Sequence, residues 1–224
     1  MSLLDFARGQ ALWFSLIVLI AGSVWRVVAI FRLGTKPDLS EPRSTRWLAG
    51  ALRGIFVRMI PRAELRPGAK LGVINGYFYH IGLAVIAFGY LPHILFVERL
   101  TGLAWPALPE PLIYVAVGLS FVSLIMVLLE RLTDAVMRLL SSFDDYFSWF
   151  VVFLPLATGM VALSGWSPQS TSGGVPVYPL PLAIHLLSVE LLFVWLPFGK
   201  LGHVFLVFFS RAITGAAIER KGAA

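Results

Sequence analysis

The chain alternates between long apolar stretches and short polar connections. Five stretches are long and nearly free of charge: residues 11–31, 74–97, 112–129, 147–163 and 182–209. A hydrocarbon core about 30 Å thick needs about 20 helical residues at roughly 1.5 Å each. Lipid offers no partner to open backbone groups, and these stretches lack the alternation of a membrane barrel strand. The pattern predicts an all-α integral membrane protein, a five-helix bundle that forms a single domain over residues 1–224.

Basic residues gather on one side of the predicted spans. The segment 32–73 carries Arg32, Lys36, Arg43, Arg46, Arg53, Arg58, Arg62, Arg66 and Lys70. The connection after the third span holds Arg131 and Arg138, and the tail after the fifth holds Arg211, Arg220 and Lys221, whereas residues 164–179 carry no charge. Because cytoplasmic loops are enriched in lysine and arginine, we expect an external amino terminus and a cytoplasmic carboxyl terminus. The expected location is the inner (cytoplasmic) membrane, with multiple passes.

Within the basic segment 32–73, apolar side chains recur with helical spacing. They are Trp47, Leu48, Leu52, Ile55, Phe56 and Met59. Arg46, Arg53 and Arg58 lie elsewhere on the same helix. This pattern predicts a helix at the membrane interface, which rests on lipid headgroups or on a partner protein.

Histidine is confined to two of the predicted spans. The four histidines are His80 and His93 in the second span and His185 and His203 in the fifth. Polar side chains in a bilayer are costly and tend to mark functional sites. These two spans cross in opposite directions. His80 and His203 are therefore expected toward the cytoplasm, and His93 and His185 toward the outside.

The spacing of the histidines supports a shared face in one span more than in the other. His185 and His203 are 18 residues apart, which is five turns of an ideal helix. His80 and His93 are 13 residues apart, which leaves them about 140° out of alignment on a straight helix. A kink at Pro92 would swing the His93 ring inward.

Composition restricts the chemistry of these histidines. Only 13% of the residues are charged and 58% are apolar, where a soluble domain carries about a quarter charged residues. Cysteine is absent, so the chain ligates no iron–sulfur cluster and attaches no haem covalently. Imidazole is the usual haem ligand where thiolate is missing, so two histidines at each of two depths predict two bis-histidine haems. The net charge of +6 follows from the topology, and no nucleic-acid partner is expected.

Glycines beside the histidines have two interpretations. Gly82 and Gly89 lie in the second span, and Gly199 and Gly202 lie just before His203. They provide room for a flat macrocycle, or they permit close packing of helices.

Two motifs resemble the respiratory nitrate reductase gamma subunit family. One combines the interval between His185 and His203 with the run LPFGKLGH at residues 196–203. The other is YHIG at residues 79–82, followed by Phe88 and Gly89. The resemblance covers residues 74–211. It implies a five-span cytochrome b in which haem iron is held by His80 with His203 and by His93 with His185.

One position departs from this family. The family pattern has a histidine ten residues after His80, where this chain has Tyr90. Either the second haem has moved with His93, or the chain holds only the cytoplasmic haem. The departure favours relatives in sulfur-metabolising complexes and some hydrogenases, whose cytochrome b contacts an iron–sulfur protein.

The expected function is therefore electron transfer between membrane quinone and a cytoplasmic iron–sulfur partner that docks on the basic segment. An external redox partner is the other option. The chain itself is not expected to be catalytic alone. The alternative is a non-redox membrane anchor or transporter, with histidines that bond across helices or relay protons. Arg26, Glu190 and Lys200 are compatible with that alternative, and the role of Glu190 is open between proton handling and a hydrogen bond to a cofactor or histidine.

Overall fold

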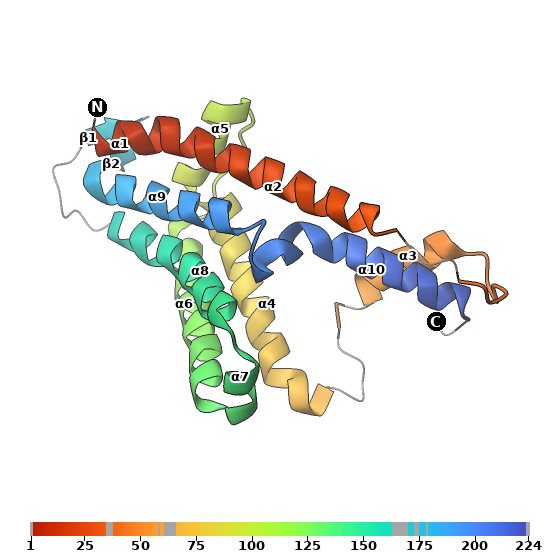
Figure 1. Ribbon diagram of the computed structural model, residues 1–224. Coiled ribbons are helices and arrows are strands. Elements are labelled where there is room, and N and C mark those ends of the chain that lie inside the picture. Colours follow the sequence, from red (N-terminus) through yellow and green to blue (C-terminus); the bar gives the residue numbers. More distant parts are fainter. Residues whose placement is uncertain are drawn as a thin grey trace. The chain divides into compact units, whose positions relative to one another are not determined.

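The computed structural model confirms the all-helical class (Figure 1). It describes residues 2–34, 38–57, 59–60, 66–162, 170–172, 175–177 and 179–222. Over these ranges, five helices are long and apolar enough to cross a membrane: Leu3–Arg32, Leu71–Gly89, Glu110–Thr133, Phe143–Ala162 and Lys200–Arg220. The basic residues Lys36, Arg58 and Arg62, and most of the uncharged connection 164–179, fall outside them.

The elements follow one another as α1 (Leu3–Phe6), the π-helix η1 (Ala7–Ala11), α2 (Leu12–Arg32), α3 (Trp47–Val57), α4 (Arg66–Gly89), α5 (Leu91–Thr101), α6 (Glu110–Thr133), α7 (Ala135–Leu140), α8 (Phe143–Ala162), β1 (Ser170–Ser172), β2 (Val175–Val177), α9 (Pro179–Trp195), the 3-10 helix η3 (Lys200–Gly202) and α10 (His203–Arg220). The two short strands pair antiparallel. The chain divides into two compact units, residues 1–15 with 70–192 and residues 16–69 with 193–224.

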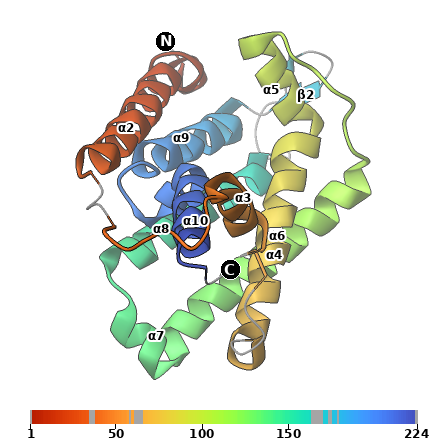
Figure 2. The same ribbon diagram turned by 90° about the vertical axis from the view of Figure 1, so that its right-hand side faces the viewer.

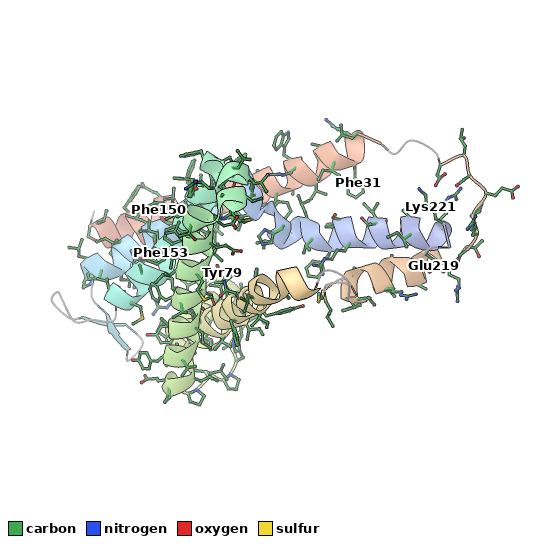
Figure 3. The ribbon with its side chains drawn as sticks, turned by 90° about the horizontal axis from the view of Figure 1, so that it is seen from below. Phe31, Tyr79, Phe150, Phe153, Glu219 and Lys221 are labelled. Carbon is green, nitrogen blue, oxygen red and sulfur yellow. The ribbon has the colours of Figure 1, made fainter. Side chains whose placement is uncertain are left out.

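The core of the first unit lies among α4, α6 and α8. It is built from Ile86, Ile113, Ala116, Val117, Leu124 and Leu156. Tyr79 of α4 and Phe153 of α8 pack against this core (Figure 3). Helices α4 and α6 approach closely at Gly82, because a Cβ there would overlap the Ser120 hydroxyl and lie 2.9 Å from the Ala116 carbonyl oxygen. The Trp149 indole donates a hydrogen bond of 2.8 Å to the Leu124 carbonyl, which ties α8 to α6.

The second predicted span, 74–97, is not one continuous helix. Helix α4 ends at Gly89, Tyr90 has extended dihedral angles (φ −82°, ψ 126°), and α5 begins at Leu91 with proline in its first turn. Proline suits a first turn because its missing N–H would have no helical partner there. The kink expected at Pro92 is thus present as a break one turn or less before His93.

Two of the carbonyls freed at the break at Tyr90 have donors from the segment after α5. Pro92 has no N–H to offer the Phe88 carbonyl, and that oxygen accepts from the Trp105 indole instead. The Gly89 carbonyl accepts from the Leu108 amide at 2.9 Å. Unsatisfied backbone groups in lipid cost several kcal/mol each, so these two bonds stabilise the break.

The prediction of one continuous helix over residues 182–209 is wrong. Helix α9 ends at Trp195, and α10 begins only at His203, after a turn and η3. The amides of Phe198 and Gly199 both bond to the Trp195 carbonyl at 3.0 Å, which closes α9. Pro197 cannot continue the regular hydrogen-bond ladder. The five-turn alignment of His185 with His203 therefore does not apply, because the two residues belong to different helices.

In the second unit, α3 lies alongside the carboxyl-terminal half of α10 (Figures 1 and 2). The contact is made by glycines: a Cβ on Gly54 would lie 2.7 Å from the Gly215 Cα and would overlap the Arg211 carbonyl oxygen. A Cβ on Gly50 would overlap the Glu219 side chain and lie 2.8 Å from the Gly215 carbonyl oxygen, and Figure 3 shows Glu219 near the end of α10. This glycine pair, four residues apart, is the motif by which membrane helices approach closely.

Polar contacts hold the start of α3 to the end of α10. Glu219 accepts from the Ser44 hydroxyl at 2.8 Å and pairs with Arg46 at 3.4 Å. Arg220 donates to the Ser40 carbonyl at 2.8 Å. Hydrogen bonds from Ser40 also lower the pKa of Asp38. The predicted helix in the basic segment is thus present, with its glycine face packed on α10 and Trp47, Leu48, Leu52 and Phe56 exposed.

Replacing Gly54 by leucine is expected to separate α3 from α10. Overpacking of a close contact costs about 1–3 kcal/mol, and here the obstacle is backbone of α10 that cannot move aside like a side chain. The measurement is denaturant unfolding of the purified protein in detergent. Gly72→Leu is the matched control, because a Cβ at Gly72 meets nothing within 4 Å. Equal stability of the two variants would contradict the packing argument.

Candidate functional site

His93 is positioned by the break between α4 and α5. It lies in the first turn of α5, two residues after the helix begins. Its Nδ1 is 2.8 Å from the Ile86 carbonyl oxygen in the preceding helix, a contact that reaches back seven residues and needs the break. The Tyr90 ring meets the His93 ring edge to face, with centroids 5.3 Å apart. The His93 side chain is therefore fixed on two sides.

His185 is positioned by small residues of α8. A Cβ on Gly159 would come within 3.2 Å of the His185 Cε1 atom, so the imidazole lies directly on the α8 backbone. The Thr158 hydroxyl oxygen is 3.3 Å from His185 Nδ1 and 2.8 Å from the Ser188 hydroxyl oxygen. Thr158 also donates to the Leu154 carbonyl at 2.8 Å, which leaves its oxygen to accept from the imidazole. Thr158, Gly159 and Ser188 were not among the expected site residues.

His93 and His185, which the sequence placed at the same depth, lie together in the first unit. Their ring centroids are 6.2 Å apart and their planes differ by 17°. Metal–imidazole bonds are about 2 Å long and the ligating nitrogen lies about 1 Å from its ring centre, so two rings on one metal ion have centres about 6 Å apart. The separation is compatible with a single iron atom between the two rings.

His80 and His203 belong to different units. His80 lies in α4 of the first unit, and His203 begins α10 in the second. Both side chains are exposed on the chain. Their pairing on one haem stays a prediction.

All four histidines direct Nδ1 toward an oxygen atom. The partners are the Gly76 carbonyl for His80 (2.7 Å), the Ile86 carbonyl for His93, the Thr158 hydroxyl for His185 and the Lys200 carbonyl for His203 (3.1 Å). A carbonyl can only accept, so Nδ1 carries the proton in the neutral rings of His80, His93 and His203. The lone pair then lies on Nε2, as in histidines whose orientation and tautomer are set for metal binding.

Other metal chemistry has little support in the described part of the chain. No group of three or more histidine, cysteine, aspartate or glutamate side chains gathers there. A haem needs only axial ligands from the protein, so a pair of histidines is a sufficient donor set.

Glu190 is the most isolated ionisable side chain of α9. It is 5% exposed, and within the described part of the chain neither carboxylate oxygen has a hydrogen-bond partner. Neither of the roles considered for it, proton handling or a bond to a cofactor, is singled out by these contacts.

Three of the four glycines near the histidines, Gly82, Gly89 and Gly202, lie against other parts of the protein. Gly82 faces Ser120, a Cβ on Gly89 would lie 2.6 Å from Leu108 Cδ1, and one on Gly202 would lie 3.6 Å from the Arg26 guanidinium carbon. Each already has a protein neighbour. Of the two interpretations of these glycines, the contacts favour close packing over room for a macrocycle.

Comparison with known proteins adds little about function. No protein-family model matches the chain. A protein of Nitratidesulfovibrio vulgaris (strain Hildenborough) is 29% identical over 224 aligned residues, covering 97% of this chain and 95% of the relative. The name of that relative, "Protein", states no activity. No solved structure matches the chain.

Proposed function

We propose that the chain is a di-haem b membrane subunit that transfers electrons between the quinone pool and an iron–sulfur partner subunit of a respiratory redox complex. The observation that carries this proposal is the His93–His185 pair, with centroids 6.2 Å apart and Nδ1 of each ring held by an oxygen. His80 and His203 are the proposed ligands of the second haem, on the cytoplasmic side.

Haem, when bound, supplies reversible one-electron chemistry, and the protein supplies axial ligands, orientation and surroundings. His93 and His185 would hold the outer iron through Nε2. Thr158 and the Ile86 carbonyl would fix the two ring orientations, which usually affects metal affinity about 10- to 100-fold. The quinone is proposed to react near this outer pair.

The iron–sulfur partner is proposed to dock on the basic segment, beside the α3–α10 pair. The exposed face of α3 carries Trp47, Leu48, Leu52 and Phe56. Arg43, Arg46 and Arg53 are exposed nearby. An apolar centre with a charged rim is typical of a protein interface. The proposed cytoplasmic placement of the basic segment rests on the positive-inside rule, and the proposed location is the inner membrane.

Quinol should reduce the bound haem directly. In proteoliposomes containing the purified chain, a short-chain quinol is added by rapid mixing. The absorbance of reduced haem b is expected to appear without added dithionite. His93→Ala is expected to slow this reduction by at least about tenfold, because the outer haem is lost. A chain whose haem is reduced by dithionite but not by quinol would contradict the quinone part of the proposal.

The alternative function, a non-redox anchor or transporter, has one observation in its favour. The 6.2 Å separation and small interplanar angle of His93 and His185 also fit a stacked ring pair, since such pairs have centroids about 4.5–7 Å apart. In that case the histidines would bond across helices. The protein would then purify without haem.

A further inference from the structure

Arg26 is a cation placed within the first apolar helix. Helix α2 runs from Leu12 to Arg32 and belongs to the candidate span Leu3–Arg32. A charged side chain in such a segment is costly unless it is paired or reaches water, and it marks a functional site by default. The contacts of Arg26 all lie within the second unit.

One nitrogen of Arg26 reaches three successive carbonyls. Nη1 is 2.8 Å from the Pro197 oxygen, 3.2 Å from that of Phe198 and 3.3 Å from that of Gly199. These residues form the break between α9 and α10. All three follow Trp195, the last residue of α9. The guanidinium therefore ties the carbonyls of this break to α2 by hydrogen bonds.

Glycines bring Arg26 close to the break. Gly22 lies four residues earlier on the same face of α2, and a Cβ there would be 2.8 Å from Pro197 Cγ. On the other side, a Cβ on Gly202 would be 3.6 Å from the Arg26 guanidinium carbon. Helix α2 thus holds the break by contact at Gly22 and by hydrogen bonds at Arg26.

The held segment leads directly to His203. The Gly202 amide bonds to the Gly199 carbonyl at 3.3 Å, the same oxygen that Arg26 contacts. His203 follows Gly202, and its Nδ1 is 3.1 Å from the Lys200 carbonyl of η3. The position and ring orientation of His203 therefore depend on a short turn whose carbonyls are fixed by Arg26.

We propose that Arg26 is a positioning residue for His203: by fixing the carbonyls of residues 197–199, it sets the turn from which the His203 imidazole is presented to haem iron. This inference rests on the proposed function, because it takes His203 as a haem ligand. It assigns to Arg26 no contact with the haem itself.

The test uses the purified full-length chain with its haems. Arg26→Leu is expected to weaken the His203-held haem by about 10- to 100-fold in affinity, the effect usual for a residue that orients a ligand. Haem transfer to excess apomyoglobin measures this affinity. The low-spin electron paramagnetic resonance signal of that haem is expected to change as well, while the signal of the His93–His185 haem stays as in the wild type.

Three further variants separate positioning from general damage. Arg26→Lys, which keeps a cation and one donor group, is expected to restore part of the affinity. Gly22→Val, which pushes α2 away from Pro197, is expected to produce the same selective loss as Arg26→Leu. Arg32→Leu removes a positive charge from the exposed end of the same helix and is expected to change neither haem.

The outcomes distinguish this inference from the proposed function. If Arg26→Leu and Gly22→Val both leave the affinities and spectra of two bound haems unchanged, the positioning role is wrong and the proposed function stands. If Arg26→Leu does not fold, Gly22→Val and Arg26→Lys decide, and equal weakening of both haems in these variants would also overturn the inference. A wild-type chain without haem would overturn both.

Discussion

Purified His93→Ala and His185→Ala proteins are each expected to carry about half the haem of the wild-type chain. The double variant is expected to carry as much haem per chain as either single variant. The two imidazoles lie 6.2 Å apart in centroid, so they are proposed to hold the same iron. Loss of either ligand should release that haem alone. Haem per chain is measured by the pyridine haemochrome assay against quantitative amino-acid analysis.

Two control variants test whether this loss is specific to the His93–His185 pair. Tyr90→Phe keeps the ring that lies edge to face with His93, and it is expected to keep both haems. His80→Ala is expected to lose the other haem, so that His80 and His93 substitutions together leave none. If the losses of His93→Ala and His185→Ala add up in the double variant, the two histidines hold different groups, and the proposed pairing is wrong.

Gly159→Val is expected to displace the His185 imidazole and to lose the outer haem. A Cβ at residue 159 already comes within 3.2 Å of the ring, and the two added methyl groups of valine need space that the ring occupies. Overpacking costs about 1–3 kcal/mol, enough to move a side chain while the helices stay formed. The measurement combines haem per chain with far-ultraviolet circular dichroism.

Gly118→Val in α6 is the matched control for Gly159→Val. A Cβ at Gly118 meets nothing within 4 Å. The same substitution is therefore made in another apolar helix at a position where the added side chain has room. This variant should keep the haem content and the helix content of the wild type. Full haem content in Gly159→Val would mean that the close contact with His185 does not matter for haem binding.

The apolar runs were sufficient to predict the helices but not their breaks. A run such as residues 182–209 has the same composition whether it forms one helix or two. Pro197 is a local signal for an end, yet prolines also occur inside membrane helices, as Pro155 does in α8. The break at Pro197 also has a distant donor, Arg26, more than 170 residues earlier in the chain. No local pattern contains that information.

The break at Tyr90 was closer to prediction. Pro92 marked the position in the sequence, and the structure adds the partners that make the break stable, the Trp105 indole and the Leu108 amide. The consequence for the site is large, because the break allows His93 to reach back to the Ile86 carbonyl. A proline indicates where a helix bends, but the direction of the bend depends on such long-range bonds.

The supporting residues of the candidate site were the least predictable part. Histidine is rare and costly in a membrane span, so its four positions stand out in the sequence. Thr158 and Gly159 are common in membrane helices and carry no such signal. Their adjacency opposite His185 depends on how α8 packs against α9, which no pattern within α8 expresses. The same holds for the contact of Gly54 with Gly215.

The most direct test of the proposed function is the haem content and ferric spectrum of the purified wild-type chain. The account predicts haem b at two per chain, with low-spin electron paramagnetic resonance signals of bis-imidazole iron. A well-folded, helical chain that carries no haem after expression with ample haem supply would contradict it. The His93–His185 pair would then be a contact between two rings and no cofactor site.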